Sequence, residues 1–467
     1  MKRKEFMQKL IKDYSLKNKK SKEIFNAASQ YQIRGGSHNL RLFPPFPLYA
    51  EKCKGSKVWD ADGNVYIDFW QGHFANVLGH NPSVVLKKLG DFFKKGQGLE
   101  TGFPEQSQRT LAELLLSRIK ADKIRFTTSG TLASMYAVML AKSYTKKEKV
   151  LKVGGGWHGA NPYVLKGIST YQNGLNKIES AGLPDSADSM ILVTRFNDEQ
   201  DLEKKFQDHG EQIACFIIEP FIGAGGFVFS SKNYLQKARD LTQKYGAVLI
   251  FDEVVSGFRF HAGPVQNLYK IKPDLTVFGK TIGGGMPVSA VAGDHDLLSL
   301  CSPEAKKEDR VKFEGGTFSG HPASMLAGAT YIQYLIEHES EIYPRIGQFG
   351  AEVRKNIEEI FSYWGFNVKC TGDGDDIAKN SSLIGVQFLH KKLDKVTFPE
   401  QAWDPEISDV ELREKAFKLA MMEEGIHTFH GFGAISASHK DNEIQYSLDA
   451  VERIAKRWKK HNIQNRL

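Results

Sequence analysis

Cysteine is scarce in this chain, with only four among 467 residues: Cys53, Cys215, Cys301 and Cys370. They are isolated and form no CxxC pair, and no histidine lies at metal-ligand spacing, so we expect neither a disulfide framework nor a metal site. No run approaches the ~20 apolar residues of a membrane-spanning helix. The N-terminus also lacks the apolar core of a secretory signal. We therefore expect a cytoplasmic protein without a membrane partner.

The sequence also lacks a basic motif with interleaved aromatic residues. The formal net charge is +8, and much of it comes from the lysine-rich stretch of residues 1–21, which we interpret as a solvated helix or tail. We expect no nucleic-acid partner, because such a role requires a basic face on a recognisable fold. With 41% hydrophobic and 25% charged residues, the composition is that of a soluble globular protein, and the length predicts two or three lobes.

Short β-rich runs alternate with helical patterns between Pro82 and Tyr334, which is typical of a parallel sheet covered by helices. The expected strands are Ile124–Thr128, Val150–Val153, Ile191–Thr194, Cys215–Ile218, Val248–Phe251 and Leu275–Phe278. Outside this block, Val58–Phe69 is predicted to be a β-hairpin that turns at Asp62-Gly63. Charged helices follow Ile336, and we expect the two chain ends to fold together.

A lysine follows the last of these strands and precedes a glycine-rich turn, in the segment FGKTIGGGMP (Phe278–Pro287). This lysine, Lys280, is expected at the carboxyl end of a strand, where ligands bind in open α/β sheets. Partial burial favours the uncharged amine, which is a nucleophile for aldehydes. Taken alone, the motif is equally compatible with an ordinary loop lysine.

The apolar run Val248–Phe251 ends in two acids, Asp252 and Glu253. Strand alternation sends them to opposite faces, so only one can serve a site at this edge. A buried carboxylate is costly without a cationic partner, and a protonated pyridine nitrogen is such a partner. We predict that Asp252 keeps a pyridine ring protonated, which makes the ring an electron acceptor. The alternative is a helix N-cap or a surface acid.

The segment FTTSGTLAS (Phe126–Ser134) leads from a strand into a helix. Hydroxyl and backbone N–H groups at a helix N-terminus bind phosphate through hydrogen bonds and a favourable dipole. Ser129, Gly130 and Thr131 are therefore candidates for phosphate binding. The same residues are equally typical of an ordinary helix cap.

The glycine-rich segment GGGWHG (Gly154–Gly159) places Trp157 just beyond another expected strand. Its indole could stack on a pyridine ring. His158 is a candidate general base, or else a loop histidine with local hydrogen bonds. All four motifs follow expected strands, as a single shared ligand site requires. Together they predict a pyridoxal 5′-phosphate (PLP) site in which Lys280 holds the cofactor as a Schiff base.

From Gly35 to His439 the chain resembles the fold-type I, class III PLP-dependent aminotransferases, and within them the glutamate-1-semialdehyde 2,1-aminomutases. The motifs that carry the resemblance are LIFDEVVSGFR (Leu249–Arg259), PDLTVFGKTIGGGMPVSA (Pro273–Ala290), GGTFSGHP (Gly315–Pro322) and AGLPDS (Ala181–Ser186). The resemblance implies an α/β fold. A large PLP-binding domain, residues 82–334, would contain a mixed, mostly parallel sheet flanked by helices. Residues 1–81 and 335–467 would form a smaller α+β domain.

The resemblance also implies roles for individual residues. Lys280 would move the proton between the substrate Cα and the cofactor, Val254 would pack on the ring, and Glu219 would lie near the cofactor. Thr317 would reach the phosphate of the neighbouring subunit's cofactor, which implies a homodimer with the site at the subunit interface. Arg41 lies near an arginine that the aminomutases place in the substrate pocket, where a guanidinium can bind a carboxylate at two points. A surface arginine is the alternative.

Departures from the family pattern bear on the reaction. Val255 replaces the glutamine of the ω-aminotransferase branch, in agreement with the aminomutases, whereas Gly431 stands where the aminomutases carry a glutamate. Two functions stay open. One is an aminotransferase that moves an amino group between an amino acid or amine and a carbonyl acceptor. The other is an isomerase, either the aminomutase or an amino-acid racemase. A catalytically idle PLP fold is a third hypothesis, disfavoured by the presence of Lys280 and Asp252.

Overall fold

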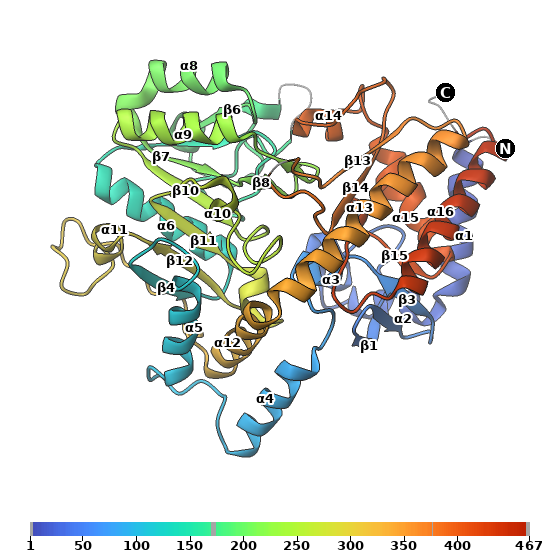
Figure 1. The fold of residues 1–467 in the computed structure, drawn as a ribbon, viewed down its shortest axis with the longest axis horizontal. Helices are drawn as coiled ribbons and strands as arrows, with labels where there is room; N and C mark the ends of the chain where they lie inside the picture. Colours follow the sequence, from blue (N-terminus) through green and yellow to red (C-terminus); the bar gives the residue numbers. More distant parts are fainter. Residues whose placement is uncertain (1–2, 170–173, 376, 464–467) are drawn as a thin grey trace.

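A seven-stranded sheet forms the centre of the larger lobe, in the order β4-β12-β11-β10-β7-β5-β6 (Figure 1). The structure is a computed structural model that describes residues 3–169, 174–375 and 377–463. Only β12 is antiparallel to its neighbours, and the other six described strands share one direction. The strands are β4 (Lys123–Thr127), β5 (Lys149–Val153), β6 (Ile191–Thr194), β7 (Ile213–Ile218), β10 (Val248–Glu253), β11 (Leu275–Phe278) and β12 (Ser289–Gly293).

Helices cover both faces of this sheet, as the alternation of strands and helices predicted. Alternate residues of each strand point to opposite faces. On β10, Val248 and Ile250 pack with α6 (Gly130–Thr145), whereas Leu249 and Phe251 pack with the other face's helices. Those helices are α8 (Glu199–His209) and α9 (Lys232–Lys244). Every residue of β7 and β10 is buried, as expected of central strands covered on both sides.

Three helices form a group beside the β4 end of the sheet, where α5 contacts β4: α4 (Ser83–Lys94), α5 (Gln106–Leu116) and α12 (Pro322–Glu337). Helix α12 packs against both of the others, and α4 projects from the body of the molecule (Figure 1). The predicted boundary between residues 334 and 335 falls within α12. The division into domains at residues 82 and 334 stays a prediction.

The two ends of the chain meet in the second lobe, where blue and red elements lie side by side in Figure 1. The predicted hairpin is present as β2 (Lys57–Asp60) and β3 (Val65–Asp68), and β3 pairs in parallel with β15 (Ile426–His427). A further sheet contains β13 (Val368–Thr371), β14 (Leu383–Phe388) and β16 (Gly431–Ala434). The main helices here are α1 (Arg3–Lys17), α13 (Glu339–Tyr363), α15 (Lys418–Glu423) and α16 (Asp441–Lys460).

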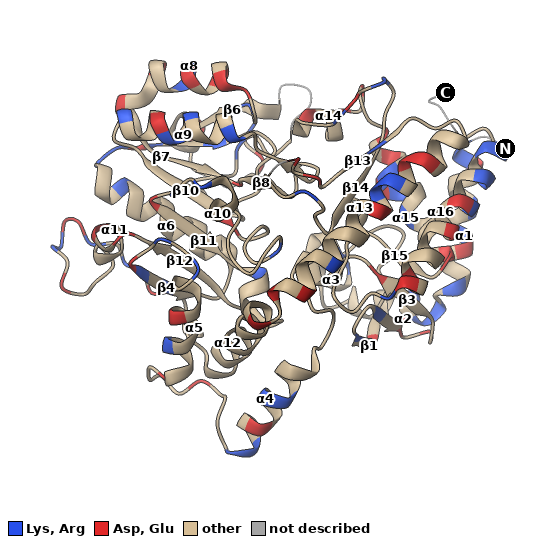
Figure 2. Cartoon of the chain, in the orientation of Figure 1, with Lys and Arg blue, Asp and Glu red and all other residues tan. Residues whose placement is uncertain are grey.

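Helix α1 corrects our interpretation of the basic N-terminal stretch as solvated. Phe6, Leu10 and Tyr14 recur at helical spacing and are buried, and the Phe6 ring packs edge-on against Trp458. Acidic and basic positions are interspersed along α1, α13 and α16 (Figure 2). No helix in the described ranges is both long enough and apolar enough to cross a membrane.

Candidate active site

A cavity of about 1380 Å³ lies at the carboxyl ends of the parallel strands. It collects every site residue predicted above except Thr317. The predicted residues that line it are Arg41, Ser129, Gly130, Thr131, Trp157, His158, Glu219, Asp252, Val254 and Lys280. Side chains that follow β4, β5, β7, β10 and β11 thus meet at one place, as parallel strands require.

Lys280 lies two residues after β11, and its backbone φ is 46°. A left-handed conformation is uncommon for a residue with a side chain and occurs where the surrounding structure enforces it, often at functional sites. Burial lowers the pKa of Lys280, and the Asp252 and Glu219 carboxylates oppose this shift. The amine therefore shares the cavity with two acids and loses its proton more readily than an exposed lysine does.

Asp252 is buried at the end of β10 and bonded to the histidine predicted beside it. One carboxylate oxygen, Oδ2, lies 2.8 Å from Nδ1 of His158, and the other accepts the backbone N–H of Val254 at 3.0 Å. Burial lowers the pKa of His158, and the bond to Asp252 opposes the shift. Glu253 points away, as alternation predicted, and accepts the backbone N–H groups of Val265 and Gln266.

The candidate phosphate site is the N-terminus of α6. Ser129 caps this helix, since its hydroxyl oxygen accepts the N–H of Leu132 at 3.3 Å. The loop that carries Trp157 packs directly on the same turn. At Gly159, φ is +84° and an added Cβ would lie 2.6 Å from Cα of Thr131. Only glycine permits this approach, which brings the indole and the helix N-terminus together.

Glu219 connects two loops of the site. Its Oε1 accepts the backbone N–H of Trp157 at 2.9 Å, and its Oε2 accepts that of Gly223 at 3.1 Å. Burial and the nearby Asp252 charge raise the pKa of Glu219. Behind this loop, the buried Lys152 amine donates to the carbonyls of Gly156 and Lys166, and burial lowers its pKa to about 7.

Arg41 lies at the cavity beside two histidines that the sequence did not single out. Its Nε donates to Nε2 of His73 at 3.2 Å, and the rings of His73 and His38 are 4.7 Å apart. Burial, aided by Arg41 and Lys280, lowers the pKa of both histidines, that of His73 to about 3. No acid within the described ranges pairs with Arg41, so its terminal nitrogens are available to an anion.

A left-handed turn aims His73 into the cavity. The four residues of α3 (Gln71–Phe74) have positive φ values of 48°, 62°, 62° and 68°. Asp68 supports the turn, because its carboxylate accepts the backbone N–H groups of Trp70 and Gln71 at 3.0 and 2.9 Å. His80 and His427 hold that carboxylate at 2.7 and 2.8 Å.

Thr317 is exposed and does not line the cavity. It lies in the loop after Gly316, where an added Cβ would be 3.9 Å from Oγ1 of Thr128. The loop therefore runs beside the segment that leads into α6. A position outside its own subunit's cavity is compatible with the expectation that Thr317 serves a neighbouring subunit.

Comparisons with known proteins agree with this geometry. The family model "Aminotransferase class-III" matches residues 42–367, which is more than half of the chain. The chain belongs to the class III aminotransferases. PLP is the cofactor of this family and of this chain, and the fold-type I architecture and the α/β fold predicted from the sequence are confirmed.

Curated relatives carry the name that the resemblance suggested. The chain is 33% identical over 442 residues to glutamate-1-semialdehyde 2,1-aminomutase of Sulfurihydrogenibium sp., covering 93% of this chain and 98% of that protein. The enzyme of the same name from Methanosphaera stadtmanae is also 33% identical over 442 residues, with 94% and 98% covered. The solved ω-transaminase of Sphaerobacter thermophilus superimposes with a TM-score of 0.83 at 27% identity, covering 93% of this chain and 97% of that one.

The residues of this class III aminotransferase fit its cofactor. The cavity offers an amine for an aldehyde, a buried carboxylate for a ring nitrogen and a helix N-terminus for a phosphate. Glycine lets the N-terminus of α6 approach Val254 closely, since an added Cβ at Gly130 would lie 3.2 Å from the Val254 side chain. Nε2 of His158 is buried and has no partner among the described residues.

Sequence reasoning missed a group of aromatic residues in the same cavity: Trp70, Phe74, Trp403, Phe429 and His430. They come from both ends of the chain, so no local motif contains them. The one available signal was the ring-rich segment FWQGHF (Phe69–Phe74) beside the hairpin. Whether these rings face the cavity depends on the left-handed turn of α3, which the residue types do not predict.

Proposed function

We propose that this class III aminotransferase transfers an amino group between separate molecules, from an amino acid or amine to a carbonyl acceptor, with Lys280 as the residue that binds the cofactor's aldehyde. One observation carries the proposal. The Lys280 amine, whose pKa burial lowers, shares one cavity with the Asp252 carboxylate and the N-terminus of α6. When bound, PLP supplies an aldehyde that amines attack and a ring that accepts electrons from the substrate Cα.

The chain's own residues would divide the work as follows. Asp252, oriented by His158, holds a proton on the ring nitrogen. Lys280 Nζ would move a proton between the substrate Cα and the cofactor's C4′ carbon. Glu219 fixes the loop that presents Trp157 to the ring face.

Arg41 is the proposed ligand of the substrate carboxylate. His73 accepts the hydrogen bond from Nε, so the guanidinium is oriented while both terminal nitrogens stay free for two-point binding. The neighbouring imidazoles of His38 and His73 are held neutral, because burial and the adjacent cations lower their pKa values. Among Arg41, His38 and His73, Arg41 is then the residue that carries the positive charge.

The backbone at Gly431 favours transfer between molecules over the aminomutase reaction. At this glycine φ is +88°, and an added Cβ would lie 2.8 Å from both N and Cβ of Val386. No glutamate can occupy this position without moving β14. The isomerase is kept as the second candidate, because the relatives at 33% identity are named aminomutases.

A two-part experiment separates these functions. Amino acids and amines are added singly to the PLP-loaded protein, and the cofactor absorption and the products are followed. An aminotransferase bleaches the absorption once per site and stops until a carbonyl acceptor is added. Continued conversion of one amino compound without an acceptor shows an isomerase. No change with any donor contradicts both.

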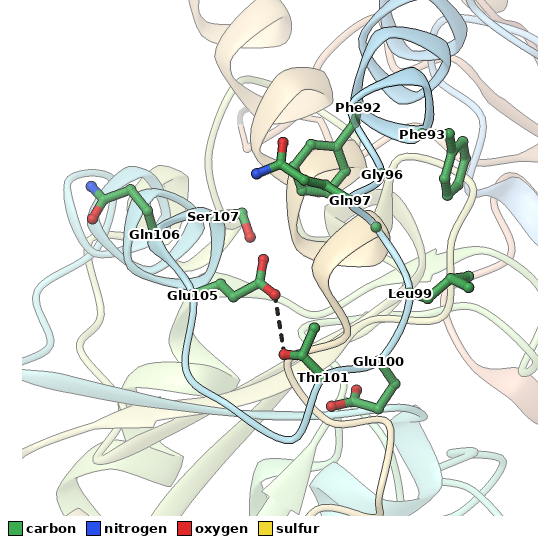
Figure 3. Close-up of a pocket in the computed structure, with 11 residues that line it drawn as sticks. Phe92, Phe93, Gly96, Gln97, Leu99, Glu100, Thr101, Glu105, Gln106 and Ser107 are labelled. Carbon is green, nitrogen blue, oxygen red and sulfur yellow. Dashed lines mark hydrogen bonds between the residues drawn. The ribbon is translucent and has the colours of Figure 1, made fainter.

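We further propose a homodimer in which the surface around Thr317 meets a second copy. Three apolar side chains there are largely exposed, Leu99 at 74%, Phe103 at 79% and Phe318 at 58%. A second cavity of about 670 Å³ adjoins them, lined by the Phe92 and Phe93 rings and by the loop with Thr101 and Glu105 (Figure 3). Exposed apolar surface of this kind marks interaction sites. Light scattering on the PLP-loaded protein tests this: twice the chain mass of 52.4 kDa supports it, and a monomer contradicts it.

A further inference from the structure

Five rings form one continuous wall of the cavity that holds Lys280: Trp70, Phe74, Trp403, Phe429 and His430. Trp70 and Phe429 are stacked, with centroids 5.0 Å apart and planes 13° apart. His430 continues the wall at 4.3 Å from Phe429 and 5.5 Å from Trp403, and Phe74 lies 6.1 Å from Phe429. We call these five residues the ring wall.

The ring wall has a polar end at His430. Its Nδ1 lies 3.4 Å from Oε1 of Glu414, and the same oxygen accepts the Nε–H of Arg413 at 2.7 Å. Burial raises the pKa of Glu414, but Arg413 and His430 outweigh it and bring the pKa to about 2. Because an ionised carboxylate only accepts hydrogen bonds, Nδ1 of His430 carries the proton that it shares with Glu414.

The other ring nitrogen of His430 is therefore free to interact with a ligand. Nε2 has no hydrogen-bond partner within residues 3–169, 174–375 and 377–463. A histidine ring nitrogen accepts a hydrogen bond when it carries no proton and donates one when it does. A ligand hydroxyl both donates and accepts, so it can bond to Nε2 in either case.

The backbone keeps this ring at the cavity. His430 has a φ of 54°, a conformation that side-chain-bearing residues adopt mainly where the fold enforces it. The neighbouring Gly431 leaves no room for a side chain, since Val386 occupies that space. The loop thus presents one ring, that of His430, beside Phe429.

We propose that the ring wall is the side-chain subsite of this enzyme, and that it selects substrates with a hydroxylated aromatic side chain whose hydroxyl bonds to Nε2 of His430. Planar rings pair favourably with stacked or edge-on aromatic neighbours. Asp252 and Glu219 are the acids within the described lining of the cavity, so the ring wall itself carries no acid. Besides His430, its polar atoms are the indole nitrogens of Trp70 and Trp403, which are buried and have no hydrogen-bond partner among the described residues. The inference rests on the proposed function, which assigns the substrate carboxylate to Arg41.

Three carboxylates that lack an amino group test the subsite without turnover: 3-phenylpropanoate, 3-cyclohexylpropanoate and 3-(4-hydroxyphenyl)propanoate. Their dissociation constants are measured by calorimetry on the PLP-loaded protein. The phenyl compound should bind about threefold to tenfold tighter than the cyclohexyl compound, because only the planar ring stacks. The hydroxyl should add a further gain of about threefold to tenfold.

Two variants assign these preferences to residues. His430→Asn removes the ring but tolerates a positive φ, and it should abolish the gain from the hydroxyl. Phe429→Leu keeps an apolar side chain and should reduce the preference for phenyl over cyclohexyl. Phe366→Leu is the matched control, since Phe366 and Phe429 are 7% and 8% exposed and Phe366 does not line the cavity. It should leave all three affinities unchanged.

Equal affinities for the phenyl and cyclohexyl compounds would overturn the subsite, and so would absence of binding by all three. If His430→Asn binds the hydroxylated compound with an undiminished gain in affinity, the role of His430 is overturned. If Phe429→Leu does not retain the cofactor, the His430→Asn variant alone tests the subsite. These titrations need no amino transfer. A failure of every donor to change the cofactor absorption would therefore remove the proposed function while the subsite measurements still stand.

Discussion

The imidazole Nδ1 of His158 lies 2.8 Å from Oδ2 of Asp252, and both side chains are buried. This pair couples the loop after β5 to the end of β10. His158 thus holds the Asp252 carboxylate, which the proposed function assigns to the ring nitrogen of the cofactor. The position of this carboxylate therefore does not depend on the cofactor alone.

Asp252→Asn should lower the rate of the first half-reaction on the order of 100-fold, because the amide cannot hold the ring proton as a carboxylate does. His158→Phe should lower it about 10-fold to 100-fold through the lost hydrogen bond to a charged group. Since His158 acts through Asp252, the double variant should be no slower than Asp252→Asn. Stopped-flow absorbance measures all three, and additive losses would contradict this dependence.

His439 makes stability depend on pH. Its ring is fully buried and stacks on Phe69, and burial lowers its pKa to about 4. An unfolded histidine titrates near ~6.5, so between about pH 6.5 and 4 the unfolded chain binds the extra proton. Stability should therefore fall as the pH falls through this window, by about 3 kcal/mol at most from this residue.

Urea unfolding at pH 7 and pH 4.5 tests the contribution of His439. His439→Gln does not titrate and should flatten the dependence on pH, whereas His295→Gln, at an exposed position, should not. An unchanged pH dependence in His439→Gln would show that other groups produce it.

Gly431→Ala should destabilise the fold by about 3 kcal/mol or more, because the added Cβ meets Val386 and the φ is positive. Gly246→Ala is the matched control, with a φ of +57° and nothing within 4 Å of the added Cβ. It should cost only about 1 kcal/mol. Denaturant unfolding compares the two, and equal losses would mean that φ alone restricts Gly431.

Asp68→Asn should loosen the left-handed turn of α3. Burial raises the pKa of Asp68, but the hydrogen bonds from His427 and His80 outweigh it and hold the pKa far below its usual range. Losing this charge should cost about 3–5 kcal/mol and weaken binding of substrate carboxylates near His73. Asp62→Asn is the control, because Asp62 only caps α2 (Lys19–Ala28) and asparagine also caps helices. Unfolding curves and carboxylate titrations measure both effects.

Much of the site could be predicted because it lies at strand ends. Strand β11 has the predicted bounds. The sequence also predicted strands that end at one edge of the sheet just before Lys280, Asp252, Trp157 and Ser129. Such an edge brings residues together without knowledge of side-chain packing. The antiparallel β12 was missed, since the sequence SAVAG has little strand character.

The substrate side of the cavity could not be predicted in this way. Trp70 and Phe429 stack although one follows β3 and the other follows β15, and their contact depends on the pairing of these two strands. His73 faces the cavity only because three residues with side chains adopt left-handed φ values, which propensity argues against. The homodimer, the cytoplasmic location and the absence of a nucleic-acid partner stay predictions.

The central claim is that the Lys280 amine binds the cofactor, and reduction of the PLP-loaded protein with borohydride tests it most directly. Reduction fixes the lysine–cofactor bond, so peptide mass spectrometry locates it. The account predicts one modified lysine, Lys280, and no modification in Lys280→Ala. Cofactor attached to another lysine, such as the buried Lys152 whose pKa is also lowered, would contradict it.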